Sequence, residues 1–434
     1  MDENELMGSM KVSKAVAKMA IPSVISSLVT VVYNMADTFF VGQTGDPLQV
    51  AAVSQTNPIF ILFMAFANMF GMGGSAAASM ALGEKKEKRV KQVSSFITYA
   101  SLIVGIVFAV ILLDGMQPVL QLFGADADTY ELAKGYTTYI SYGAPFIIWS
   151  AAASFVVRAD GASREAMTGS MIGTVANIIL DPIFISGFGM GAAGAAIATT
   201  IGNIMASVYY LWYFCRKSRN MSMAFRYFKC GDRILSQVCS AGLPTAIFSA
   251  LMSISTIILN QILVAYGNAP VAAIGIVFKA NMFITFLQMG LANGVQPLLG
   301  YSYGAGNRER FIAVERYTKK CCLIVGVLAT ALFFFFREPI IRLFISDTEV
   351  INYGVEMLIA YMISGPVIGI LFMNMNCMQS TGNALPATIL SILRQGVLLI
   401  PVLYGLNALL GLHGVIYGPV SYTHLRAHET TLHL

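Results

Sequence analysis

Charged side chains are scarce in this sequence. They make up 11% of its 434 residues, whereas 56% of the residues are hydrophobic. A chain with so few polar groups cannot cover a water-facing surface, so its composition excludes an ordinary globular protein and predicts lipid as its main solvent. The net charge of +5 does not indicate nucleic-acid binding, because the basic residues fall in short loops between apolar runs.

Residues that carry enzymatic or metal chemistry are equally scarce. Of the four histidines, only His413 lies outside the C-terminal tail. The six cysteines have no C-x-x-C spacing, which argues against a disulfide or metal framework. Four residues from Gly71 to Gly74 are rich in glycine, but no P-loop lysine follows them, so nucleotide binding is not expected. We therefore expect neither an enzyme nor a bound cofactor.

What the sequence does contain is an internal duplication. Short motifs of the first half return in the same order in the second half, at offsets between 220 and 223 residues. Examples are Pro22 with Pro244, Gly71 with Gly294, and Gly161 with Gly382. Weak internal symmetry in an apolar chain is typical of secondary transporters, in which two bundles surround a central binding site.

Apolar segments long enough to cross a membrane recur along both halves. They lie at about 15–41, 49–80, 92–113, 130–157, 164–187, 192–214, 234–266, 270–302, 314–336, 349–379, 384–410 and from 412 onward. We predict an all-α polytopic membrane protein with twelve transmembrane helices, the twelfth truncated, in two pseudo-symmetric six-helix bundles related as parallel repeats. The expected divisions are an N-terminal lobe at 1–214, a cytoplasmic linker at 215–233, a C-terminal lobe at 234–421 and a tail at 422–434.

The charge of the loops predicts the orientation. Most lysines and arginines fall near the N-terminus and in alternate loops, including the linker at 215–233. By the positive-inside rule, both termini and the linker are expected in the cytoplasm. Apolar character ends near Ser421, short of a full span, and the polar tail at 422–434 resembles an artefactual read-through. We expect this tail to have no role in transport.

Two carboxylates inside apolar segments are the sharpest signal of function. Asp37 and Asp181 lie in the first and fifth segments, where an ionised side chain costs at least ~2.5–3.5 kcal/mol. Such a group usually faces a cavity and exchanges a proton or holds a cation. The second half has Asn260 and Ile400 at the matching positions, so ion coupling is predicted for the N-terminal bundle alone. The alternative is that each aspartate caps a helix or pairs with a neighbour.

Neutral oxygens lie near the second carboxylate. Asn177 precedes Asp181 by four residues and therefore shares its helical face. Thr199 and Thr200 in the sixth segment offer hydroxyl oxygens, although threonine commonly bonds its own helix backbone. Carboxylate, amide and hydroxyl oxygens suit a hard monovalent cation or a proton site.

Four residues of the second half are candidates for lining a central cavity. Lys279 and Arg394 are cations at membrane depth that could line the cavity or neutralise a carboxylate, and Arg394 could instead reach the cytoplasmic face. Met282 and Phe283 could form the adaptable wall of a promiscuous site. Their alternative role is ordinary packing against lipid or the core.

These motifs together resemble the MATE (multidrug and toxin extrusion) family, and most closely its MepA-like bacterial branch. The matching pieces lie at 36–42, 158–161, 177–182, 296–297, 304–307 and 394–396. The resemblance implies a two-lobe antiporter that exports cationic or amphipathic drugs or toxins in exchange for H⁺ or Na⁺. It also implies a cation site at Asp37, Asn177, Asp181 and Thr199, with Na⁺ held by the first three.

The same resemblance implies a monomer that spans the bacterial plasma membrane and has no nucleic-acid partner. The acidic C-lobe ion site found in another branch of the family is not matched, because the seventh segment has no carboxylate. The alternative within the superfamily is a flippase for lipids or lipid-linked oligosaccharides.

Overall fold

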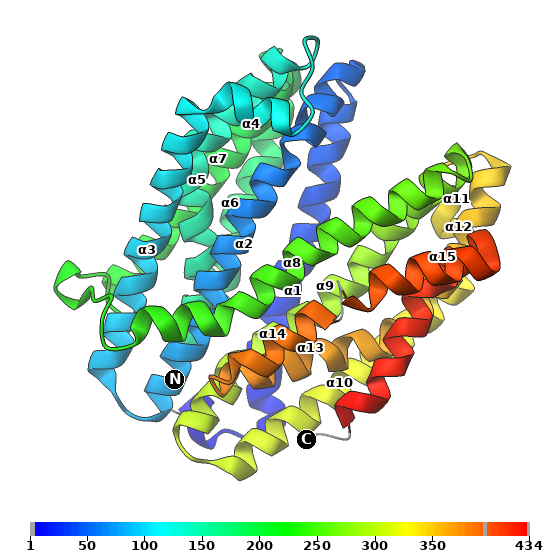
Figure 1. Cartoon of the computed structure of the whole chain (residues 1–434). Coiled ribbons are helices and arrows are strands. Elements are labelled where there is room, and N and C mark those ends of the chain that lie inside the picture. The colour runs from blue at the N-terminus through cyan, green and yellow to red at the C-terminus, as the bar shows by residue number, and fades with distance from the viewer. Residues whose placement is uncertain (1–4, 394–396, 432–434) are drawn as a thin grey trace.

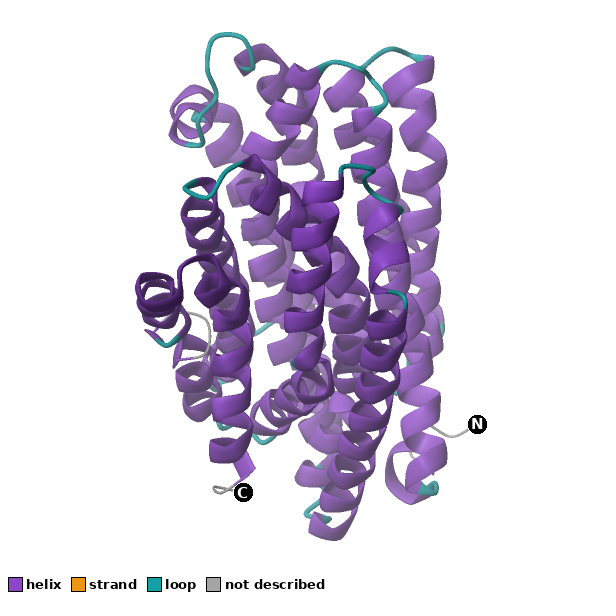
Figure 2. Cartoon of the chain, turned by 90° about the vertical axis from the view of Figure 1, so that its right-hand side faces the viewer, coloured by secondary structure: helices purple, strands orange, loops and turns teal. Residues whose placement is uncertain are grey.

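The fold is helical throughout. The structure, a computed structural model, describes residues 5–393 and 397–431, and these ranges contain no β-strand (Figure 2). The first half forms the N lobe, in which the short turn η1 (Glu5–Ser9) precedes the first helix and the short turn η2 (Ile183–Gly187) lies between α6 and α7. Its helices are α1 (Val12–Gly42), α2 (Pro47–Gly83), α3 (Glu87–Asp114), α4 (Met116–Leu122), α5 (Tyr130–Ala159), α6 (Ser163–Pro182) and α7 (Gly191–Arg216).

The second half forms the C lobe. A linker containing the short turn η3 (Phe225–Tyr227) leads into it. Its helices are α8 (Ile234–Val264), α9 (Asn268–Gly304), α10 (Arg308–Phe335), α11 (Arg337–Arg342), α12 (Thr348–Ile363), α13 (Gly365–Ser380), α14 (Ala384–Ile392) and α15 (Leu399–Thr431). Figure 1 shows the two lobes as separate groups of helices that diverge toward the upper end.

Helix lengths repeat from one lobe to the other, as the internal duplication predicts. Helices α1 and α8 both have 31 residues, α2 and α9 both have 37, and α3 and α10 both have 28. A short helix then follows in each lobe, α4 in the first and α11 in the second. These short helices were not expected from hydropathy, because neither is long enough to cross a membrane.

The two lobes differ at one place, where the single helix α5 of the N lobe corresponds to two helices, α12 and α13, of the C lobe. Helix α5 is continuous over 30 residues despite Pro145, whereas α12 and α13 meet at a 45° bend. Proline at position 366 cannot donate to the carbonyl of Met362, four residues earlier, and this favours a bend. The hydroxyl of Thr330 donates to that carbonyl at 3.0 Å, so the bend leaves it satisfied.

Among the described residues, ten helices are long and apolar enough to span a membrane, or eleven if the bent pair counts as one span. The difference from the expected twelve lies at the C-terminal end. The predicted segment 384–410 is divided between α14 and the start of α15. Helix α15 breaks at Gly411, where φ is 58°, and this break coincides with the predicted boundary before 412.

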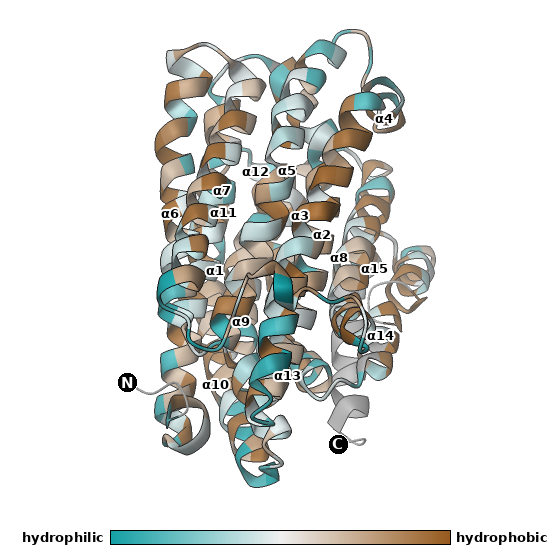
Figure 3. Cartoon of the chain, turned by 90° about the vertical axis from the view of Figure 1, so that its left-hand side faces the viewer, coloured by the Kyte–Doolittle hydropathy of each residue, from teal (hydrophilic) through white to brown (hydrophobic). Residues whose placement is uncertain are grey.

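The backbone of α15 remains helical to Thr431, past the point near Ser421 where apolar character ends. Hydropathy marks where a helix can lie in lipid, whereas polar residues can extend the same helix beyond the membrane. Hydrophilic residues elsewhere gather in loops and toward the lower end, and the middles of the helices are mostly hydrophobic (Figure 3).

The two lobes contact each other through small residues. A Cβ atom added to Gly73 of α2 would lie 1.9 Å from the carbonyl oxygen of Val238 in α8, and one added to Gly242 of α8 would lie 1.9 Å from the carbonyl oxygen of Met69 in α2. Such distances leave room for hydrogen only, so the backbones touch. This contact lies in the half of α2 that leads to the turn before α3, at the lower end of Figure 1.

Helices α1 and α9 contact each other at the same end. A Cβ atom added to Gly290 or Gly294 of α9 would lie 2.8 Å from the Cα atom of Val24 or Ala20 of α1, respectively. The buried side chain of Gln296 crosses between the lobes and donates to the carbonyl of Met72 at 3.3 Å.

Arg310 binds the N-terminal segment. Its Nε and Nη1 donate to the carbonyls of Met7 and Met10 at 2.8 Å, and its Nη2 donates to the carbonyl of Leu6 at 3.2 Å. The side chains of Leu6 and Met7 are buried in a hydrophobic cluster with residues of α1, α9, α10 and α13. The first residues of the N lobe are therefore held by the C lobe.

Candidate functional site

Three buried polar side chains meet between α6 and α7. Asp181 is fully buried, and Asn177 and Thr199 are 3% and 4% exposed. The amide of Asn177 suits both neighbours when its nitrogen faces Asp181 and its oxygen faces Thr199. It then donates to Asp181 Oδ2 at 2.9 Å and accepts from Thr199 Oγ1 at 3.1 Å. The four-residue spacing thus places Asn177 and Asp181 on one face of α6, beside Thr199 of α7.

Helix α1 completes this group, which we call the carboxylate cluster. The hydroxyl groups of Tyr33 and Thr199 lie 3.4 Å apart. Asp37, one turn after Tyr33, is half-buried, and its charge interacts with that of Asp181 across the α1–α6 interface. Tyr136 of α5 lies within the electrostatic reach of both carboxylates. The cluster therefore comprises Tyr33, Asp37, Tyr136, Asn177, Asp181 and Thr199.

One oxygen of the cluster has no partner. Among the described residues, the buried Oδ1 atom of Asp181 accepts no hydrogen bond. An unsatisfied carboxylate oxygen is costly in a low-dielectric interior, so a proton or a cation bound there would remove a real penalty. Carboxylate, amide and hydroxyl oxygens also form a donor set that a hard monovalent cation accepts. The cluster is chemically suited to bind and release such an ion.

The described part of the chain contains no group of three histidine, cysteine, aspartate or glutamate residues able to hold a metal ion.

The structure brings together all four residues that the sequence assigned to a cation site: Asp37, Asn177, Asp181 and Thr199. Thr200 points elsewhere, since its hydroxyl donates to the carbonyl of Tyr139 at 3.1 Å. Two members of the cluster were missed. Tyr33 could have been found because it lies one turn before Asp37, whereas Tyr136 gave no signal in the sequence.

The predicted cavity residues lie in the other lobe. Lys279 on α9 is exposed, and Met282 and Phe283 beside it are half-buried. Arg394 lies outside the described residues.

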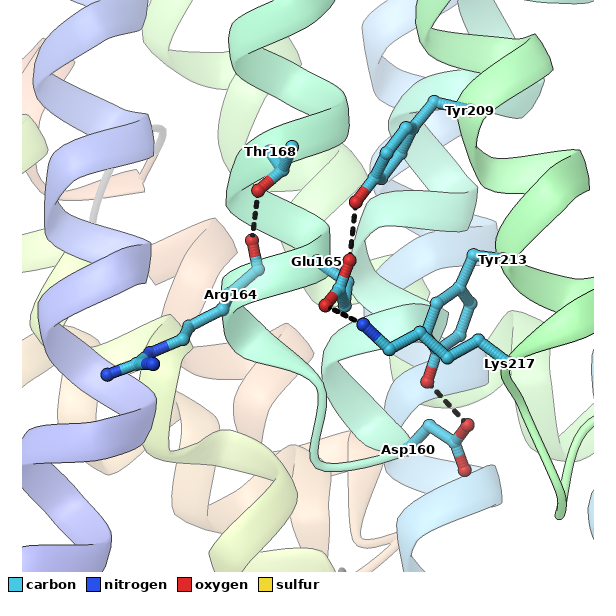
Figure 4. Close-up of polar contacts among 7 residues, drawn as sticks. All are labelled: Asp160, Arg164, Glu165, Thr168, Tyr209, Tyr213 and Lys217. Carbon is cyan, nitrogen blue, oxygen red and sulfur yellow. Dashed lines mark hydrogen bonds and ion pairs between the residues drawn. The ribbon is translucent and has the colours of Figure 1, made fainter. Parts of the chain in front are cut away.

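A second polar cluster lies at the cytoplasmic end of the N lobe as the sequence orients it (Figure 4). Glu165 of α6 accepts a hydrogen bond from Tyr209 of α7 and pairs with Lys217. Asp160, between α5 and α6, is 1% exposed and accepts from Tyr213 of α7 at 2.8 Å.

The linker contributes two more donors to Asp160. Its carboxylate accepts from Ser218 at 2.6 Å and from Asn220 at 3.1 Å. Burial raises the pKa of Asp160 above its ordinary value, and the three side-chain hydrogen bonds oppose that rise. Since both oxygens have protein donors, Asp160 anchors the linker and offers no free acceptor, unlike Asp181.

Replacing Asp160 with alanine should destabilise the N lobe. Three donors would lose a buried charged acceptor, at a cost of about 2–3 kcal/mol. We expect a lower melting temperature in detergent for Asp160→Ala, measured by intrinsic fluorescence. Asp160→Asn, which keeps an acceptor oxygen and the shape, should lose less. Equal melting temperatures for wild type and Asp160→Ala would contradict the anchoring role.

The two halves of the chain match one family of known proteins. The family model described as MatE matches residues 22–183 and again residues 244–404. The chain belongs to the MatE family. Each match covers most of one lobe, so the two copies of the family model coincide with the internal duplication.

Individual relatives of this MatE protein are close in length. The multidrug export protein MepA of Staphylococcus saprophyticus is 33% identical over 406 residues, covering 94% of this chain and 90% of the relative. MepA of Staphylococcus aureus has the same identity and coverage. These matches confirm the predicted family and its MepA-like branch, and with them the expectation of a membrane transporter rather than an enzyme.

Solved structures match the whole fold. One, described as the outward-facing conformation of a multidrug resistance MATE family transporter, superposes with a TM-score of 0.94 at 25% identity, covering 100% of this chain and 97% of the other. Another is a transporter of the MOP superfamily from Pyrococcus furiosus, described as having a binding pocket of reverse polarity. It has a TM-score of 0.92 at 26% identity, covering 99% of this chain and 96% of the other.

Proposed function

We propose that this MatE protein is a multidrug efflux antiporter, which exports cationic or amphipathic compounds in exchange for H⁺ or Na⁺ by alternating access. The observation that carries the proposal is the unpartnered Oδ1 atom of Asp181 in a buried cluster that also contains Asp37. Two interacting carboxylates away from water favour uptake of one positive charge. The MepA relatives, named as multidrug export proteins, support the transported class.

Helix α1 is suited to link ion binding to movement of the lobes. Its outer half carries Tyr33 and Asp37 in the carboxylate cluster, and its inner half packs on Gly290 and Gly294 of the C lobe. An ion that neutralises the cluster changes the hydrogen bonds that hold the outer half of α1. Any resulting shift of α1 reaches the contact between the lobes directly, because the same helix makes both contacts.

The arrangement of the lobes supports an outward-facing state. The glycine contacts between α2 and α8 and between α1 and α9 lie toward one end, and the helices diverge toward the other (Figure 1). If the basic loops are cytoplasmic, the joined end is the cytoplasmic end. A coupling ion and a drug would then exchange with the outside in this state, and reversal would require the glycine contacts to separate.

Transport into vesicles tests the function and separates the two coupling ions. The purified protein would be reconstituted, and efflux of fluorescent amphiphiles measured with a pH gradient, a Na⁺ gradient or neither. Export driven by one gradient alone would identify H⁺ or Na⁺ as the coupling ion. Equal fluxes in all three conditions would indicate passive permeation and contradict antiport.

We further propose that the linker and both termini are cytoplasmic, in a bacterial plasma membrane. The native Cys215 and Cys230 near the two ends of the linker are exposed and free. In intact cells an impermeant thiol reagent should leave both unlabelled, and permeabilisation should expose them. The control is Asp128→Cys, in the exposed loop before α5, which intact cells should label. Labelling of Cys215 and Cys230 in intact cells would reverse the orientation.

A further inference from the structure

Lys279 is a cation with no role in the mechanism so far. It lies on α9, is exposed, and takes part in none of the ion pairs formed among the described residues. It is the twelfth of the 37 residues of α9, and the basic turn after this helix lies at the other end. A lysine this deep in a membrane helix is costly unless its amine faces water or an anion.

The helical phase of α9 shows which way Lys279 faces. Gly290, which touches Val24 of α1, follows Lys279 by eleven residues, or about three turns of an α-helix. The two residues therefore lie on one face of α9, the face directed at the N lobe. Phe283 lies between them on the same face.

The opposite face of α9 packs into the C lobe. Ala280, Ile284 and Gln288 are all buried there. The Lys279 face is instead open beyond the contact at Gly290: a Cβ atom added to Gly275, one turn from Lys279, would have nothing within 4 Å. Helices α1 and α9 diverge toward the upper end of Figure 1, the end at which α9 begins. Lys279 and Phe283 precede Gly290 in the chain and therefore lie on this side of the contact with α1.

We propose that Lys279 determines specificity by pairing with a carboxylate of the exported amphiphile, whose apolar part packs on Phe283. This inference rests on the proposed export function and names its substrate class. The ammonium group attracts an anionic group and repels a cation, most strongly where neighbouring apolar surface excludes water. Because the two carboxylates of the ion site lie on the other lobe, the two lobes present opposite charges.

The ordinary alternative is that Lys279 faces lipid, and the position of Lys279 in α9 argues against this alternative. A lysine in contact with lipid normally lies near a helix end, from which its amine reaches the headgroups. Lys279 instead shares its face with Gly290, which α1 of the N lobe covers three turns further along. That face turns toward the partner lobe rather than toward the bilayer.

A matched pair of probes tests this role. A fluorescent quinolone carboxylic acid and its methyl ester differ by the one charge that Lys279 would recognise. Binding of each to the purified full-length protein would be measured by fluorescence, and export by vesicle efflux. Wild type should prefer the acid by about tenfold, which corresponds to one well-placed charge pair.

Three variants make the result specific. Lys279→Gln should bring the acid-to-ester ratio to about one, and Lys279→Arg should keep it within about twofold of wild type. Lys88→Gln removes an exposed lysine at the cytoplasmic end and should leave the ratio unchanged. A ratio that Lys279→Gln does not alter, equal losses for acid and ester, or no binding of the acid by wild type would each overturn the proposal.

The binding measurement separates this inference from the proposed function. If wild type bound the acid through Lys279 but moved neither probe under a gradient, the export function would fail and the specificity role would stand. If export occurred with the same acid-to-ester ratio in Lys279→Gln, the specificity role would fail and the export function would stand.

Discussion

Asp181→Asn is expected to abolish gradient-driven export without unfolding the protein. The substitution keeps the shape and the hydrogen bond with Asn177, but it removes the charge that a proton or Na⁺ would neutralise. Since Asp181 is fully buried with one unpartnered oxygen, a neutral amide there also relieves a desolvation cost. Efflux from vesicles should fall to the rate measured without a gradient, while the melting temperature stays equal to wild type or rises.

Two further variants provide a second test of the coupling role and a control. Asp37→Asn should impair coupling as well, because the two carboxylates interact. Asp160→Asn is the matched control, since it makes the same change at another buried aspartate that we assign to anchoring the linker. Full gradient-driven export by a well-expressed Asp181→Asn protein would rule out the coupling role.

The second large effect is expected from adding one methyl group at Gly73. Its Cβ atom would lie 1.9 Å from the carbonyl oxygen of Val238, a backbone atom that no rotamer change can move. Helices α2 and α8 would have to separate, which destabilises the state in which the lobes are joined at this contact. Overpacking of this kind costs about 1–3 kcal/mol, enough to shift a two-state ratio roughly 5- to 150-fold.

Conformation can be measured for Gly73→Ala by spin-label distances between the lobes. The population in which the lobes are joined at the glycine contacts should decrease, and efflux should decrease with it. Gly405→Ala on α15 is the control, because nothing lies within 4 Å of a Cβ atom at that position. An unchanged distance distribution in Gly73→Ala would mean that the glycine contact does not determine which end is closed.

Much of this architecture could be predicted from the sequence. The apolar segments locate nearly all of the long helices, because a membrane requires continuous apolar runs of at least a minimum length. The carboxylate cluster was also accessible, since Asp37 and Asp181 are conspicuous in apolar surroundings and Asn177 follows from helical spacing. Tyr136 was not accessible, because only the packing of α5 against α6 and α7 brings it near the carboxylates.

Other features depend on how helices pack. The bend at Pro366 could not be predicted from proline alone, since Pro145 lies in a continuous helix of the matching segment. The direction of Lys279 requires knowing that Gly290 touches Val24, a contact between residues far apart in the chain. Periodicity relates the residues of one helix to each other, but it does not show which neighbour each face meets.

The hydrogen bonds from Arg310 to the carbonyls of Leu6, Met7 and Met10, which we call the Arg310 clamp, have a consequence for the synthesis of the protein. It joins Arg310 to Leu6, two residues 304 positions apart, so one partner leaves the ribosome long before the other. While the N lobe is being synthesised, the carbonyls of η1 and the face of α1 that packs on the C lobe do not yet have their C-lobe partners. Chains divided at Gly231 should nevertheless assemble when the two fragments are produced together, because the clamp and the glycine contacts connect the fragments without a covalent link.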